Sequence, residues 1–175
     1  MYIVVTGAPG SGKTSLAQRL GPAFGLPVLG KDTIKAALVE VLGADTVQES
    51  RRLGGAAVAA LLAVAEEAGC GVLDSVWVDR PTAVARLSAL PGRVVEVFCR
   101  CEPDLLRERY RERAASRGPG HFDLDRSEEE LWNDSSLQPL DGGWPVVTVD
   151  TSTQLDVKAV TERIRRALSS LRTAE

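Results

Sequence analysis

The chain lacks the features that would place it in a membrane or in a secretory pathway. None of its apolar runs approaches the roughly 20 residues that a membrane-spanning helix needs. The first predicted strand begins at Tyr2, which leaves no room before it for a signal peptide. We therefore expect a cytoplasmic protein with no membrane partner.

Cysteine and histidine are also scarce, with three cysteines and one histidine in the chain. Cys99 and Cys101 lie two apart in a predicted strand, so they share a face and are poorly placed to pair with each other. No cysteine belongs to a C-x-x-C motif, and His121 is remote from all three in the sequence. This pattern disfavours a zinc site and predicts reduced thiols.

A basic excess is missing too. The 21 basic side chains are outnumbered by 24 acidic ones, which gives a net charge of −3 and argues against duplex nucleic acid as a partner. The length of 175 residues, with 44% hydrophobic residues, is typical of one globular domain. We expect a single domain over residues 1–175.

The most specific pattern that is present is a glycine-rich loop of the form G-x-x-x-x-G-K-[ST]. A short apolar strand, 2–6, precedes it, and a helix is predicted to follow from about residue 13. In this context, backbone N–H groups and the helix N-terminus bind phosphate, the lysine reaches the β- and γ-phosphates, and the hydroxyl of the last residue binds Mg²⁺. The predicted nucleotide-binding residues are Gly7, Ala8, Pro9, Gly10, Ser11, Gly12, Lys13, Thr14 and Ser15.

Strand and helix signals alternate along the chain, which predicts an α/β fold with a mostly parallel sheet between two helical layers. The expected strands are 2–6, 25–30, 71–75, 93–99 and 145–150. The expected helices are about 13–20, 33–42, 50–68, 81–90, 103–116 and 154–171, with Gly54-Gly55 as a weak or bent point of the third. Five parallel strands bind ligands at their carboxyl ends, so side chains just after each strand are candidates for chemistry.

Two aspartates follow strands at that edge. Asp74 ends the predicted strand 71–75, where it can hold Mg²⁺ directly or through water, or cap the turn. Asp32 follows the strand 25–30, where a carboxylate can accept the proton of a substrate hydroxyl. An aspartate is also a good N-cap for the next helix, and the two roles are compatible.

Arginines recur on the predicted helix 103–116. Arg109, Arg113 and Arg117 are spaced by four, so they share one helical face that leads into a Gly-Pro-Gly break. Such a row suits a lid, over about residues 113–127, that closes on ATP phosphates. The alternative is a surface covered with ion pairs, to which we assign Arg107 and Arg111.

Several other side chains leave two interpretations open. Trp77 and Trp132 can line an acceptor pocket or pack in the core. Arg51 can meet an anionic substrate or remain solvated, and His121 is more typical of a solvated loop residue than of a catalytic one. The turn 150–153 is expected beside the adenine base or as an ordinary helix cap.

The combination of motifs resembles the small AAA-type P-loop kinase-like family, which is related to zeta toxin and chloramphenicol phosphotransferase. The resemblance spans about residues 1–152, without the long extensions of a toxin. It is carried by the loop 7–14, the Lys-Asp-Thr-Ile-Lys run 31–35, the strand end 73–75, the segment 101–109 and the Arg-Gly-Pro-Gly-His run 117–121. It implies an adenylate-kinase-like core, with Asp32 on the acceptor side and the lid arginines in the 109–117 region.

These patterns predict an ATP- and Mg²⁺-dependent phosphotransferase that acts on a hydroxyl of a small molecule, such as an antibiotic, a sugar or a nucleoside. The predicted catalytic residues are Asp32, Lys13, Arg113 and Arg117, with Arg109 binding nucleotide and Thr14 and Asp74 binding the metal. One alternative is a polynucleotide-end kinase, which would need a basic groove. Another is a non-catalytic ATP-dependent switch. A GTPase is disfavoured because the sequence has neither N-K-x-D nor D-x-x-G.

Overall fold

A five-stranded parallel sheet forms the centre of the protein. The computed structural model describes residues 1–116, 122 and 126–170. In these residues the strand order is β2-β3-β1-β4-β5, and every neighbouring pair is parallel, as the sequence predicts. The strands are β1 (Tyr2–Thr6), β2 (Val28–Gly30), β3 (Gly71–Asp74), β4 (Val94–Arg100) and β5 (Val146–Asp150). The helices are α1 (Lys13–Phe24), α2 (Lys31–Leu42), α3 (Val47–Ala68), α4 (Arg80–Ser88), α5 (Pro103–Ser116), α6 (Glu128–Leu131), α7 (Asp134–Leu137) and α8 (Val157–Ser170).

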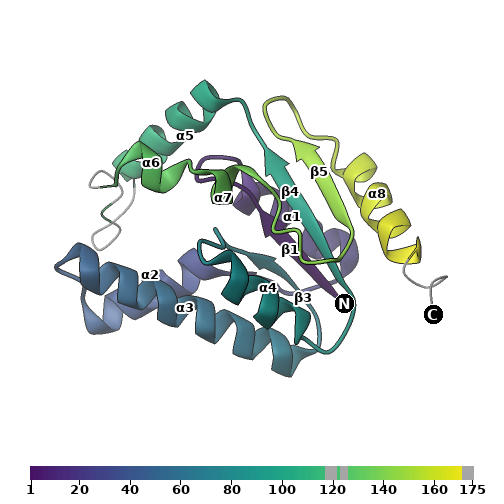
Figure 1. Cartoon of the computed structure of the whole chain (residues 1–175), viewed down its shortest axis with the longest axis horizontal. Helices are drawn as coiled ribbons and strands as arrows, with labels where there is room; N and C mark the ends of the chain where they lie inside the picture. Colours follow the sequence, from purple (N-terminus) through teal and green to yellow (C-terminus); the bar gives the residue numbers. More distant parts are fainter. Residues whose placement is uncertain (117–121, 123–125, 171–175) are drawn as a thin grey trace.

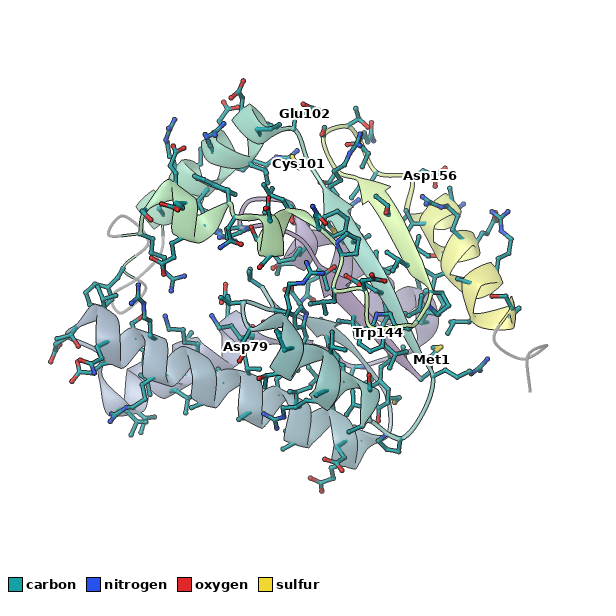
Figure 2. The ribbon with its side chains drawn as sticks, viewed as in Figure 1. Met1, Asp79, Cys101, Glu102, Trp144 and Asp156 are labelled. Atoms are coloured by element: carbon teal, nitrogen blue, oxygen red, sulfur yellow. The ribbon has the colours of Figure 1, made fainter. Side chains whose placement is uncertain are left out.

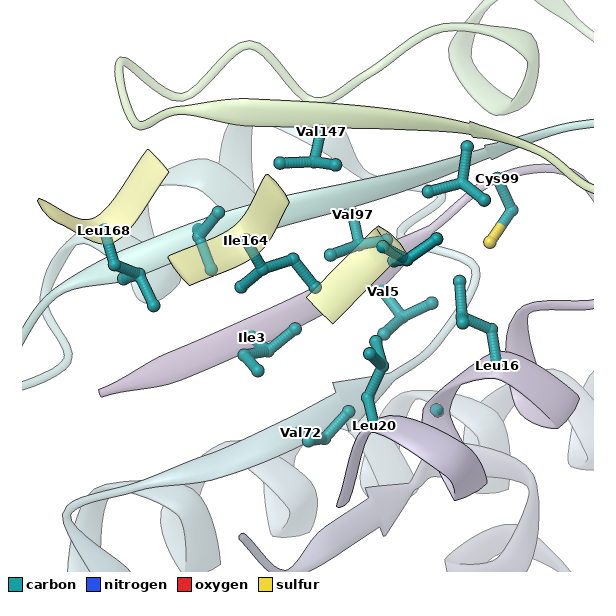
Figure 3. Close-up of a cluster of buried hydrophobic side chains, with 14 residues drawn as sticks. Ile3, Val5, Leu16, Leu20, Val72, Val97, Cys99, Val147, Ile164 and Leu168 are labelled. Atoms are coloured by element: carbon teal, nitrogen blue, oxygen red, sulfur yellow. The ribbon is translucent and has the colours of Figure 1, made fainter. Parts of the chain in front are cut away.

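Helices cover both faces of the sheet, which explains why the central strand is apolar throughout. Successive side chains of a strand point to opposite faces. Ile3 and Val5 of β1 therefore pack on one face with α1 and α8, as Figure 3 shows. Tyr2 and Val4 pack on the other face against residues of α3 and α4. The resulting fold has three layers, with the core on both sides of β1.

Two helices begin earlier than the sequence predicts. The helix α2 starts at Lys31 with Gly30 as its N-cap, so Asp32 lies inside the first turn and does not cap the helix. The helix α3 starts at Val47, where Thr46 and Glu49 form a reciprocal capping box. The glycine pair 54–55 does not interrupt α3, which continues for 22 residues. Its apolar residues pack along the sheet, and this tertiary contact outweighs the weak helix preference of glycine.

The segment between α5 and β5 contains two short helices that the sequence analysis did not predict. The side chains of Ser127 and Asn133 each accept a hydrogen bond from a backbone N–H three residues later, and these caps define α6 and α7. Arg80 holds α7 and the chain after it, because its guanidinium donates to the carbonyl groups of Ser135, Gln138, Pro139 and Leu140. This segment is thereby fixed against the start of α4.

The fully buried carboxylate of Glu96, in β4, also holds the chain that follows α7. Its Oε1 accepts hydrogen bonds from Thr6 Oγ1 at 2.6 Å and from the Leu140 N–H at 2.8 Å. Its Oε2 accepts one from Trp144 Nε1 at 3.3 Å. Because Thr6 is the last residue of β1, Glu96 joins the central strand to the chain that follows α7.

The three cysteines are free thiols, as predicted. Burial raises the pKa of the Cys99 thiol to about 12, which keeps it protonated. None of the helices in the described ranges combines the length and the apolar character that a membrane crossing needs. In Figure 1, α2, α3 and α4 lie on one side of the sheet's carboxyl edge, and α5 and α6 lie on the other.

Candidate active site

The glycine-rich loop joins β1 to α1 in a conformation that requires its glycines. Gly7, Gly10 and Gly12 have φ angles of 129°, 87° and 77°, a region that other residues rarely adopt. A Cβ atom on Gly7 would lie 2.5 Å from the Cys99 carbonyl oxygen, and one on Gly10 would overlap the Leu106 carbonyl. The backbone of the loop is therefore packed directly against the end of β4 and the first turn of α5.

The first turn of α1 is open to a ligand. Its N-cap, Gly12, has no side chain that could accept from the N–H groups of this turn. Ser11 Oγ is buried beside them and has no hydrogen-bond partner among the described residues. Unpaired donors at a helix N-terminus fit phosphate oxygens, so the loop meets the requirement that the motif implies.

Lys13, Thr14 and Asp74 come together at the carboxyl edge of the sheet. Lys13 is 6% exposed, and its Nζ donates to the Ala8 carbonyl at 2.9 Å. Burial lowers the pKa of Lys13, while the nearby Asp74 acts in the opposite direction. Burial raises the pKa of Asp74, which Lys13 and a hydrogen bond with the Thr14 side chain partly offset. Each residue thus lies in reach of the other two.

This arrangement fits Mg²⁺ as P-loop proteins hold it. The part of the chain that the structure describes has no cluster of three or more His, Cys, Asp or Glu side chains that could hold a metal by itself. Mg²⁺ is usually bound through one or two side chains together with substrate phosphates and waters. Thr14 and Asp74 offer that pair of oxygen ligands, and their role as ligands stays a prediction.

Side chains from three later segments fix the loop. Thr151 Oγ1 donates to the Ser11 carbonyl at 2.7 Å, and Trp132 Nε1 donates to the Pro9 carbonyl at 3.1 Å. Arg109 donates to the Thr151 carbonyl at 3.0 Å and also contacts Cys101 Sγ at 3.5 Å. Arg109 therefore supports the loop indirectly, through Thr151. Direct contact of Arg109 with a nucleotide stays a prediction. Figure 2 labels Cys101 where β4 leads into α5.

A cavity of about 500 Å³ begins at the phosphate loop and extends between α3 and α4 on one side and α5, α6 and α7 on the other. Lys13, Thr14, Asp74 and Asp32 all line it. The Asp32 side chain is 46% exposed, and its Oδ1 lies 3.2 Å from Lys31 Nζ. The structure thus brings the predicted base and the predicted phosphate-binding residues to one cavity, which we call the acceptor cavity.

The predicted arginine row divides between two environments. Arg113 lines the acceptor cavity, lies over the Tyr110 ring at 5.6 Å, and its charge contributes to lowering the pKa of Lys13. Arg109 points to Thr151 instead. Arg117, His121 and most of the predicted lid lie outside the described residues. Arg107 makes the surface ion pairs that we expected, with Asp104 and Glu128 at 3.3 Å each.

Some residues of the cavity were not predicted from the sequence. Arg126 lines it, and its Nε is buried with no hydrogen-bond partner among the described residues. It lies in the predicted lid region but outside the spacing of four, so that signal missed it. Arg51 lines the cavity and pairs with Glu130 at 3.0 Å, which links α3 to α6. Trp77 is buried in the core and also lines the cavity, and a role in binding an acceptor stays a prediction for it.

Comparison with known proteins places this site in a family. Residues 3–135 match the model of a family described as an AAA domain. The chain belongs to this AAA-domain family. Its five-stranded parallel sheet and glycine-rich loop are those of a P-loop kinase-like protein within it. A search of the curated proteins found no match.

Solved structures support the same assignment. One from Chloroflexus aurantiacus J-10-fl, described as a "putative kinase", is 30% identical over 95% of this chain and 97% of its own, with a TM-score of 0.80. A sugar kinase from Janibacter sp. HTCC2649 is 17% identical over 96% and 94% of the two chains, with a TM-score of 0.57. A gluconokinase from Sinorhizobium meliloti 1021 is 20% identical over 97% and 92%, with a TM-score of 0.56. The last two show a shared fold.

Proposed function

We propose that the protein transfers the γ-phosphoryl group of ATP to a hydroxyl of a small molecule, with Mg²⁺. The observation that carries this proposal is the acceptor cavity, because one continuous space joins the phosphate loop to Asp32. A nucleotide switch needs a phosphate site but has no need of a cavity that continues from that site past Asp32 to α3 and α4. The kinase fold of the solved relatives agrees with this assignment.

Each residue has a distinct part in the reaction. The loop N–H groups and Lys13 bind the phosphates, and Thr14 and Asp74 would hold the metal. Asp32 accepts the proton of the acceptor hydroxyl while the hydroxyl oxygen of the acceptor bonds to the γ-phosphorus. At the same time the bond between the γ-phosphorus and the β,γ-bridging oxygen breaks, and ADP leaves. Mg²⁺, when bound, neutralises charge on the phosphate oxygens. Arg113 and Arg126 stabilise the negative charge of the transferring group from the other side of the cavity.

The decisive experiment compares the wild-type protein with Asp32→Asn in an acceptor screen. Each protein is incubated with ATP, Mg²⁺ and pools of antibiotics, sugars, nucleosides and short 5′-hydroxyl oligonucleotides, and products that gain one phosphate are identified by mass. We expect Asp32→Asn to keep ATP affinity and to lower transfer by at least ~100-fold. Asp156→Asn is the matched control, because Asp156 also lies at the start of a helix but outside the cavity.

The outcomes separate the candidate functions. Near wild-type transfer by Asp32→Asn would overturn the assignment of this residue as the base. A product formed only from the oligonucleotides would favour the polynucleotide-end kinase. Tight ATP binding without any phosphorylated product would favour the ATP-dependent switch.

A further inference from the structure

One face of α3 lines the acceptor cavity and carries two adjacent glycines in the middle of the helix. The residues of this face are Ser50, Arg51, Gly54, Gly55, Val58 and Leu62. Glycine is among the least favourable residues for a helix interior, second only to proline. Two in succession in a continuous 22-residue helix therefore require a physical reason.

Packing among the described residues does not supply that reason. Within this part of the chain, a Cβ atom on Gly55 would meet no other atom within 4 Å, and one on Gly54 would meet only the end of the Lys31 side chain at 3.8 Å. Neither glycine has the positive φ that would demand it. The contrast is Gly10, where a Cβ would overlap the backbone of Leu106. Alanine would fit at both helix positions. The effect of the glycine pair is that no side chain covers the α3 backbone where it faces the cavity.

The bare backbone lies opposite the start of α2, where the predicted base is placed. The helices α2 and α3 pack against each other, with Lys35 Nζ donating to Ser50 Oγ at 2.6 Å and Lys31 beside Gly54. Asp32 follows Lys31 directly. A molecule whose hydroxyl reaches Asp32 therefore has the glycine pair along its side.

Beyond the glycines the cavity wall becomes apolar. Val58 and Leu62 of α3 line it there together with Trp77, Val78 and Ala83, and Val78 is 69% exposed. Two buried hydrogen-bonding groups also belong to the lining. Trp77 is 6% exposed and Ser75 is 4% exposed, and neither Trp77 Nε1 nor Ser75 Oγ has a hydrogen-bond partner among the described residues. Buried polar groups without partners are costly and rare, so a missing partner is indicated.

We propose that the acceptor is a hydroxyl compound with a flat ring, which lies on the Gly54-Gly55 backbone and extends its ring over the apolar wall. This proposal rests on the proposed function and names its substrate class. Trp77 and Ser75 hydrogen-bond to an oxygen or nitrogen atom of the ring or its substituent. A sugar without such a ring should bind less tightly, because the part of the wall formed by Val58, Val78 and Leu62 offers its hydroxyl groups no hydrogen-bond partners.

Matched pairs of probes, in which only one member carries a flat ring, test this class. Uridine is compared with ribose, and phenyl β-D-glucoside with methyl β-D-glucoside, by ligand-detected NMR in the presence of Mg²⁺ and a non-hydrolysable ATP analogue. We expect at least one ring-bearing probe to bind at least ~10-fold more tightly than its partner, since it buries additional apolar area. Equal binding within both pairs, or no binding by either ring-bearing probe, would overturn the proposal.

Substitutions at the glycines localise the effect. Gly55→Leu should weaken binding of the ring-bearing probe by at least ~10-fold, because the new side chain occupies the platform. Ala56→Leu is the control, since Ala56 is exposed on the same helix but does not line the cavity. Binding that survives Gly55→Leu would contradict the placement.

A stability measurement separates this role from a structural one. Gly55→Ala should raise Tm by about 2–4 °C while it weakens probe binding, because alanine favours the helix and narrows the cavity. A lowered Tm would mean that the fold requires the glycine and would overturn the proposal.

The two proposals can fail separately. If Asp32→Asn abolishes transfer but no ring preference exists, only the substrate class is wrong. If the ring-bearing probe binds on the glycine pair but no phosphate is ever transferred, the proposed function is wrong, and the glycine pair binds ring compounds as ligands that are not phosphate acceptors.

Discussion

The phosphate loop and the acceptor cavity are adjacent, but they differ in how many of their buried polar atoms have hydrogen-bond partners. The loop is held by the chain itself, through Thr151, Trp132 and Lys13, and only Ser11 Oγ is buried there without a partner among the described residues. In the cavity, three buried atoms have no hydrogen-bond partner among the described residues. These atoms are Trp77 Nε1, Ser75 Oγ and Arg126 Nε. Under the proposed function, the loop is a preorganised phosphate site, and the cavity would complete its hydrogen bonds only with the acceptor bound.

Glu96 lies at the junction of these two regions. It binds Thr6, directly before the phosphate loop, and the N–H of Leu140, which lines the cavity. A substitution of Glu96 should therefore affect both the phosphate loop and the acceptor cavity. A substitution within one of these regions should affect only that region.

The largest effect that we expect is on the phosphate side. Lys13→Ala should lower ATP turnover, including slow hydrolysis without acceptor, by about 10³-fold, because the substitution removes the cation that stabilises charge on the transferring group. Steady-state assays of phosphate release measure this. Lys158→Ala, an exposed lysine of α8, is the control and should keep wild-type turnover. A loss below tenfold would show that the loop does not act as a catalytic phosphate site.

A smaller effect is expected at the junction. Glu96→Gln should lower the free energy of unfolding by about 1–3 kcal/mol. The two carboxylate oxygens accept hydrogen bonds from three donors, and the substitution replaces one of these oxygens with an amide nitrogen that cannot accept. Urea unfolding followed by tryptophan fluorescence measures the change. Glu162→Gln on α8 is the exposed control. Unchanged stability would mean that Glu96 does not join the two regions.

The smallest effect separates the two arginines on α5 that the sequence assigns different roles. Arg109→Ala should weaken ATP binding by about 1 kcal/mol, since its hydrogen bond to Thr151 supports the loop. Arg111→Ala should change it by far less, because Arg111 is exposed on the same helix. Calorimetric titration of both variants with ATP gives the comparison. Equal effects would contradict the division of the row into supporting and surface arginines.

The sequence predicted the glycine-rich loop and the parallel sheet because the determinants of both are local. Three glycines, a lysine and a threonine at fixed spacing between a strand and a helix specify one loop conformation, and alternating strand and helix signals specify the parallel sheet. Asp74 was identified as a metal-ligand candidate for the same reason, since it ends a short apolar strand. Local patterns failed at helix starts, where Asp32 proved to lie inside α2, and in the segment of α6 and α7.

By itself, the sequence determined a P-loop kinase-like fold and its glycine-rich loop, because both depend on neighbouring residues in the chain. Only the tertiary structure decided which distant side chains share the acceptor cavity, that Arg113 faces it while Arg109 supports Thr151, and that Gly54-Gly55 lies opposite the residue before Asp32. Helical spacing gives the face on which a residue lies but not what packs against that face. The partner of each face is set by how α3, α5 and the segment after α7 are folded over the sheet.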